Sequence, residues 1–172
     1  MEASRAEGQG GYFDAGRLSP GEFMGMGAAL VLFLSLFLPW FGTSSTNENS
    51  KLGDGSITGG DSASAWQVFS TLDILLVLAA SAPFILTWII GRGHKLTWKP
   101  GEVTMIVGMT ALVLILCNGI ILGRPGDANG DSFAISLSFG YFIALLASAG
   151  MLAAGYLRQA VYTDARKPPG VI

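Results

Sequence analysis

Residues 66–90 read WQVFSTLDILLVLAASAPFILTWII, and this stretch decides the fold. Asp73 is its only charged side chain, and Pro83 is its only proline. About 20 apolar helical residues span the roughly 30 Å hydrocarbon core of a bilayer. Lipid offers no water to hydrogen-bond exposed amides, so such a segment must satisfy its backbone groups within a helix. We therefore predict a transmembrane helix over residues 66–90.

Three other segments have the same apolar character, and each is about 19–25 residues long, which suits a membrane span. A helix of a water-soluble bundle would carry polar residues on one face, and these segments lack such a face. We expect an all-α fold, a bundle of four transmembrane helices. Its helices are predicted over 23–41, 66–90, 103–122 and 133–157 within a domain 19–159, with outer loops 42–65 and 123–132 and polar tails 1–18 and 160–172.

The composition supports this class. Of the 172 residues, 51% are hydrophobic and only 13% are charged, about half the charge of an ordinary soluble domain. The formal net charge of −2 gives no reason to expect a nucleic-acid partner. The single cysteine, Cys117, excludes an internal disulfide and a thiolate metal cluster. The bilayer itself is the partner that the composition predicts.

The basic residues set the orientation. Two of the ten Lys and Arg residues, Lys51 and Arg124, fall on one side of the predicted helices. Basic residues near transmembrane helices concentrate in the cytoplasm, so both termini and the 91–101 connection are predicted to be cytoplasmic. The other eight residues lie on that cytoplasmic side: Arg5, Arg17, Arg92, Lys95, Lys99, Arg158, Arg166 and Lys167.

Two helix starts look alike. Ser19-Pro20-Gly21-Glu22 supplies an N-cap serine, a proline at the first helical position and a glutamate at the third. Pro-Gly-Glu recurs at residues 100–102, also on the predicted cytoplasmic side. The recurrence is compatible with a duplicated two-helix hairpin, and shared capping physics explains it equally well.

Asp73 is the most informative single residue. Placed about seven residues into the helix predicted from residue 66, it would lie roughly 10 Å below the outer surface. A carboxylate at that depth is costly unless it faces the bundle interior and has a partner. Asn118 and Arg124 are the candidate partners. The site is either a structural clamp between helices or a proton or cation site.

Small residues recur along the predicted helices. Such residues let helix backbones approach closely, because lipid tails supply no hydrophobic drive for association. They are predicted to pack inside the bundle, with an oligomer interface along the last helix as the alternative. The residues are Gly25, Gly119, Gly123, Gly140, Ala144 and Ser148.

Tryptophans at helix ends are typical of the membrane–water interface, where an amphipathic ring has one apolar and one wet side. Four are predicted as such anchors: Trp40, Trp66, Trp88 and Trp98.

Catalytic sets are missing. His94 is the only histidine, and no phosphate loop, zinc motif or Ser/His/Asp set is present. We therefore expect a non-enzyme with no cofactor and no metal.

Leu36-Phe37-Leu38-Pro39-Trp40-Phe41-Gly42, followed by Ser64-Ala65-Trp66 and Leu72-Asp73-Ile74-Leu75-Leu76, carries a resemblance. The chain resembles a group of small four-helix membrane proteins of actinobacteria and their relatives, most of them uncharacterised. The resemblance implies a multi-pass protein of the bacterial plasma membrane and supplies no activity. Arg124 departs from that pattern because it follows a glycine rather than an aromatic residue.

These observations favour a structural or accessory membrane protein, either homo-oligomeric or bound to a larger membrane complex. The alternative is a small channel or transporter with its polar site around Asp73. A conduit needs inward polar groups at successive depths, and Asp73 and Asn118 alone are few.

The orientation can be tested by labelling. Single cysteines at Ser45 and Asn129 should react with an impermeant thiol reagent on intact cells, and one at Thr163 should be protected, because the basic asymmetry puts the first two outside. Labelling of Thr163 alone would reverse the orientation.

Overall fold

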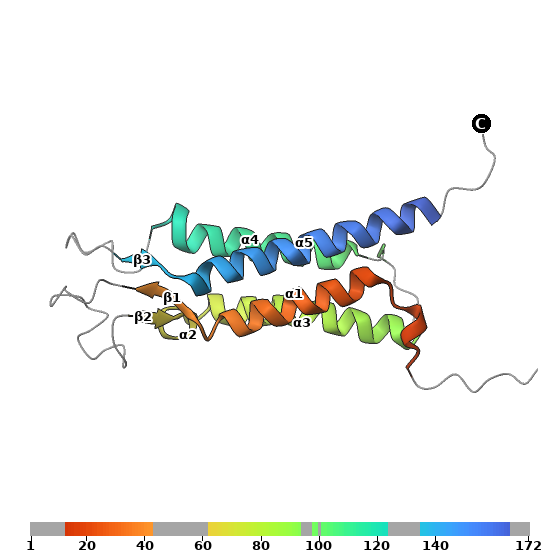
Figure 1. Ribbon diagram of the computed structural model, residues 1–172, viewed down its shortest axis with the longest axis horizontal. Coiled ribbons are helices and arrows are strands. Elements are labelled where there is room, and N and C mark those ends of the chain that lie inside the picture. The colour runs from red at the N-terminus through yellow and green to blue at the C-terminus, as the bar shows by residue number, and fades with distance from the viewer. Residues whose placement is uncertain (1–12, 43–61, 94–97, 100, 124–134, 166–172) are drawn as a thin grey trace, which may run out of the picture.

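The protein is described by a computed structural model (Figure 1). The structure describes residues 13–42, 62–93, 98–99, 101–123 and 135–165, with side chains to residue 161 in the last range. Most of them are helical, and the long helices lie lengthwise beside one another. These are α1 (Pro20–Ser35), α3 (Leu72–Gly91), α4 (Glu102–Leu116) and α5 (Phe139–Ala165), with short helices η1 (Ala15–Arg17) and α2 (Ala65–Val68).

Helix α5 has the most extensive contacts. It packs against α1 along one side and α4 along another, α3 packs on α1, and α3 contacts α4 less extensively. Successive long helices run in opposite directions, as the colours of Figure 1 show. One end of the bundle carries a small sheet, and the other end carries η1 and the end of α5.

Within the described residues, three helices are long and apolar enough to cross a membrane: Leu72–Gly91, Glu102–Ile121 and Phe139–Val161. The second of these runs from α4 into a π-helical turn, η2 (Cys117–Ile121). Helix α1, with 16 residues, is apolar but shorter. The predicted first span over 23–41 therefore differs from the observed helix, which begins at Pro20 and ends at Ser35.

The sheet corrects the all-α prediction. Strand β1 (Pro39–Gly42) lies between β2 (Ser62–Ser64) and β3 (Ser136–Leu137) and is antiparallel to both. Phe41 is opposite Ala63 on one side and Leu137 on the other. Pro39 cannot continue the helix before it, because proline lacks an amide hydrogen and restricts the preceding residue. After tight turns at residues 36–38, the chain thus becomes an extended strand at Pro39 and pairs with the ends of the two predicted outer loops.

The helix predicted over 66–90 is divided. Ser64 and Gln67 form a capping box at the start of α2, and Phe69, with extended backbone, ends it. Helix α3 starts anew at Leu72, so Asp73 lies in its first turn rather than seven residues inside a helix. The last helix also starts later than the predicted residue 133, at Phe139, and continues to Ala165.

Glycines bring α4 and α5 close together. A Cβ added to Gly108 would lie 2.6 Å from the backbone nitrogen of Leu152, and one added to Gly155 would collide with the backbone of Met105. Gly101, at the start of α4, has φ +89° and faces Gly155. Such contact distances leave no space for a side chain, so small residues at these positions are a requirement of the fold.

Gly108→Ala should destabilise the bundle. The added methyl would push against the backbone of α5, which cannot move away as a flexible side chain could, and overpacking of this kind costs about 1–3 kcal/mol. Gly27→Ala is the matched control, because a Cβ at Gly27 meets nothing within 4 Å. Thermal unfolding in a mild detergent should show a lower midpoint for Gly108→Ala only. Equal midpoints for the two variants would contradict the close approach of α4 and α5.

Candidate functional site

Few polar side chains are buried in the described part of the chain. They are Glu22, Ser35, Asp73, Thr87 and Ser148. Asp73 lies near the sheet end of the bundle and Glu22 at the opposite end. Ser35 and Ser148 donate to main-chain oxygens of their own helices, at Leu32 and Leu145. The two buried carboxylates are therefore the groups that could carry chemistry.

Asp73 is 1% exposed, and its Oδ1 has no hydrogen-bond partner among the described residues. Asn118, predicted as a partner, instead directs its side-chain nitrogen to the main-chain oxygen of Leu114 at 2.9 Å. Arg124, the other predicted partner, lies outside the described residues. Burying an oxygen without a hydrogen-bond donor is unfavourable. The acidic residue at position 73 therefore either serves something other than stability or has a partner outside the described residues.

Other donors at the sheet end are already engaged. The indole nitrogen of Trp40 donates to the Ser35 oxygen at 2.8 Å, and the Tyr141 hydroxyl donates to the Ile115 oxygen at 2.9 Å. Both acceptors lie where a helix loses its regular ladder, at the end of α1 and just before the π-helical turn. The Ser35 oxygen also accepts the Leu38 amide, so both donors bond to carbonyls at points where the helix geometry changes.

Tyr141 explains the π-helical turn. Its ring fills the space beside Gly119, where an added Cβ would collide with it. The ring also packs edge-on against Trp40, with centroids 5.6 Å apart, and both side chains are fully buried. The prediction of Trp40 as an interface anchor is wrong for this reason. Sequence reasoning missed the Trp40–Tyr141 contact because a tryptophan at the end of a predicted helix resembles an interface residue.

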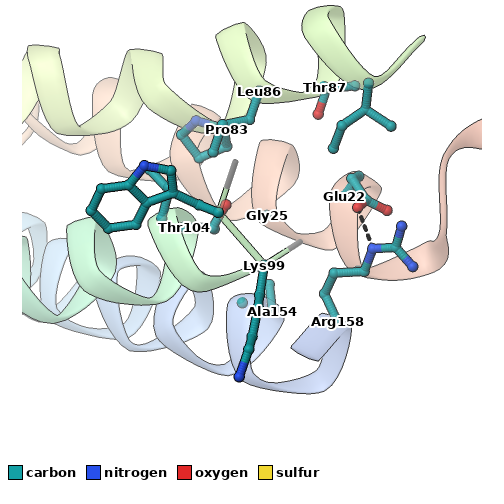
Figure 2. Close-up of a pocket in the computed structure, with 15 residues that line it drawn as sticks. Glu22, Gly25, Pro83, Leu86, Thr87, Lys99, Thr104, Ala154 and Arg158 are labelled. Atoms are coloured by element: carbon teal, nitrogen blue, oxygen red, sulfur yellow. Dashed lines mark hydrogen bonds and ion pairs between the residues drawn. The ribbon is translucent and has the colours of Figure 1, made fainter. Parts of the chain in front are cut away.

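Glu22 and Arg158 form the second polar feature. Arg158 Nε lies 2.5 Å from Glu22 Oε1, which joins α1 to α5 (Figure 2). The other carboxylate oxygen accepts the Ser19 amide at 2.6 Å and the Ser19 hydroxyl, completing the capping box expected from Ser19-Pro20-Gly21-Glu22. The side chains are only 7% and 18% exposed. A pair this buried costs much if one partner is removed, because the other charge is then left unpaired.

Sequence reasoning found the cap and missed Arg158 as its partner. The signal was present: Arg158 is the only basic residue within the last long helix, and Gly21 precedes Glu22. A Cβ added to Gly21 would lie 3.0 Å from the Arg158 Cβ, so the glycine lets the arginine approach α1.

The small residues predicted to pack lie as follows. Gly140, Ala144 and Ser148 are buried, and a Cβ added to Gly140 would lie 2.6 Å from the Pro39 oxygen. Gly25 faces Thr104, Ala154 and Pro83 at ordinary contact distances. Gly123 has φ +89° and follows the π-helical turn.

The remaining predicted anchors are at the surface. Trp66, Trp88 and Trp98 are 41%, 50% and 57% exposed. Within the described residues, no group of three or more His, Cys, Asp and Glu side chains could hold a metal ion.

Comparison of the chain with protein-family models, with curated proteins and with solved structures finds no match.

Two substitutions at Asp73 should separate the contribution of side-chain shape to stability from that of the acceptor oxygen. Asp73→Asn should keep the fold, because the amide has the same size and an oxygen suited to the first turn of α3. Asp73→Leu should lower stability by about 1 kcal/mol, because no acceptor or negative charge remains at this helix N-terminus. Thermal unfolding in detergent measures both. Equal midpoints for the Asn and Leu variants would show that the oxygen at residue 73 has no structural role.

Proposed function

We propose that the chain is a small non-enzymatic integral membrane protein that acts as a structural or accessory subunit of a membrane assembly. In this proposal α1, α3, α4 and α5 all cross the bilayer, both termini are cytoplasmic, and the membrane is a bacterial plasma membrane. The last point rests on the resemblance of the Leu36–Gly42 and Ser64–Leu76 segments to small bacterial membrane proteins.

The length and the exposed apolar surface of α1 support a fourth span. Its 16 residues give roughly 24 Å of helix. The amides of Leu36, Phe37 and Leu38 continue in tight turns to the oxygens three residues before them, which adds length before Pro39. Exposed apolar side chains, including Phe23, Leu30 and Leu34, face away from the other helices. A surface of this kind suits lipid.

The ends of the bundle support the orientation. Arg17, Arg92, Lys99 and Arg158 belong to the end opposite the sheet: Asp14 bonds to Gly91 there, and Gly101 packs on Arg158. Basic residues at one end and an apolar body agree with a cytoplasmic position for that end.

One observation carries the structural role: away from the basic end, the interior between the helices is filled. Leu32, Leu76, Ile115 and Met151 are fully buried, and the buried serines bond to their own helices. A conduit would present polar groups at successive depths for a solute to use. Besides those serines, the buried polar side chains of the described interior are Asp73 at one end and Glu22 and Thr87 toward the other, which favours a packing role.

The second candidate function is a small channel or transporter with its polar site around Asp73. The buried Oδ1 without a described partner is the observation that favours it. Ionisable groups inside a membrane bundle commonly mark ion or proton pathways.

Reconstitution decides between the two functions. The purified chain is placed in vesicles that contain a pH-sensitive dye, and a potassium gradient with valinomycin drives proton movement. The structural role predicts the same flux as protein-free vesicles, for wild type and for Asp73→Asn. Proton flux in wild type that Asp73→Asn abolishes and Cys117→Ser retains would replace the structural role with the transporter.

A further inference from the structure

A small pocket lies at the basic end of the bundle, among α1, α3, α4 and α5. Figure 2 shows Pro83 of α3, Thr104 of α4 and Gly25 of α1 gathered around it. Its volume is about 20 Å³, and about 10–15 Å³ is enough for one water molecule. Two of the lining residues, Trp98 and Lys99, are exposed, so the pocket reaches the surface. The size of the pocket therefore suits water rather than a larger ligand.

Thr87 brings a buried hydroxyl to this pocket. The residue is 4% exposed and lies in α3, one turn after Pro83. Several other hydroxyls within the long helices donate to carbonyl oxygens three or four residues earlier, as Ser81, Thr110 and Ser148 do. Thr87 makes no hydrogen bond with any other described residue, and its hydroxyl points from α3 into the pocket (Figure 2). An unpaired buried hydroxyl is unfavourable, so this one indicates a partner within the pocket.

Glu22 supplies an acceptor on the α1 side of the same pocket. Its carboxylate accepts one hydrogen bond from Arg158 and two from Ser19, three of the roughly four that a carboxylate can accept. Glu22 and Arg158 neutralise each other, and the Lys99 side chain extends away from Glu22 in Figure 2. A neutral molecule that both donates and accepts therefore fits this lining better than an ion does.

We propose that one water molecule binds in this pocket, where it accepts a hydrogen bond from the Thr87 hydroxyl of α3 and donates one to the Glu22 carboxylate of α1. Thr104, which lines the α4 side, is a further polar neighbour. Buried waters typically make about three hydrogen bonds to polar groups that the protein leaves unpaired. The bridge ties α3 to the Glu22–Arg158 pair and through it to both α1 and α5.

Nuclear Overhauser effects between water and alanine methyl groups test the site in the detergent-purified chain. The Ala154 methyl lines the pocket, is fully buried and has no exchangeable proton on its side chain. It should show a water cross-peak with the sign of a slowly tumbling pair. The Ala29 methyl is equally buried within the apolar core and should show none.

Two glycine variants test whether the cross-peak comes from the pocket. Gly25→Ala places a methyl among the lining residues, 3.4 Å from Thr104 Cγ2 and 3.7 Å from Ala154 Cβ, so the chain can fold around it. It should displace the water and remove the Ala154 cross-peak. Gly27→Ala is the matched control, because its Cβ meets nothing within 4 Å, and it should retain the cross-peak.

Thr87→Val tests the bridge through stability, because valine has the shape of threonine and no hydroxyl. With a bound water, the variant should lower the midpoint of thermal unfolding in detergent by about 2–4 °C, the shift expected for one hydrogen bond in a chain of this length. In a dry pocket, loss of an unpaired hydroxyl would leave the midpoint unchanged or raise it. Thr110→Val is the matched control, because that exposed hydroxyl bonds to its own helix outside the pocket.

Absence of a water cross-peak at Ala154 in wild type would overturn the proposal, as would a Thr87→Val midpoint equal to or above that of wild type. A cross-peak of equal strength at Ala29 would also overturn it, because water would then penetrate the bundle generally.

Discussion

The close approach of α5 to α1 and α4 is the constraint on which the rest of the structure depends. Gly108 and Gly155 leave no room for side chains between α4 and α5, and Gly150 lies against Ala28 of α1. Apolar association gains little inside lipid, where the surroundings are as apolar as the side chains. Dispersion contacts between backbones in close range must then hold the helices, and each added methyl weakens many of them.

Both ends of the bundle depend on such close contacts at glycines. At the basic end, Gly21 allows Arg158 to reach Glu22, so the ion pair and the cap of α1 share one carboxylate. At the other end, Gly140 packs on the Pro39 oxygen and Gly119 on the Tyr141 ring, which positions β1 and the aromatic cluster.

Sequence periodicity predicted the apolar helices and the capped start at Ser19, because these depend on local composition and local hydrogen bonds. It did not predict the sheet, since strands of two to four residues gain stability only after the helices bring residues 39–42, 62–64 and 136–137 together. The break before α3 was also missed, because Ser70 and Thr71 are tolerated in a membrane helix. The Glu22–Arg158 pair spans 136 residues of sequence; the isolated Arg158 pointed to a partner, but no local pattern identifies that partner as Glu22.

Disulfide cross-linking between α1 and α5 tests the central packing most directly. A Cβ at residue 150 lies 3.3 Å from the Ala28 Cβ, close to the roughly 3.5–4.5 Å that a disulfide requires. In a Cys117→Ser background, the pair Ala28→Cys and Gly150→Cys should oxidise rapidly to an intramolecular disulfide in membranes, and the pair Gly27→Cys and Gly150→Cys should not. Equal cross-linking of both pairs, or none with the Ala28 pair, would contradict the account.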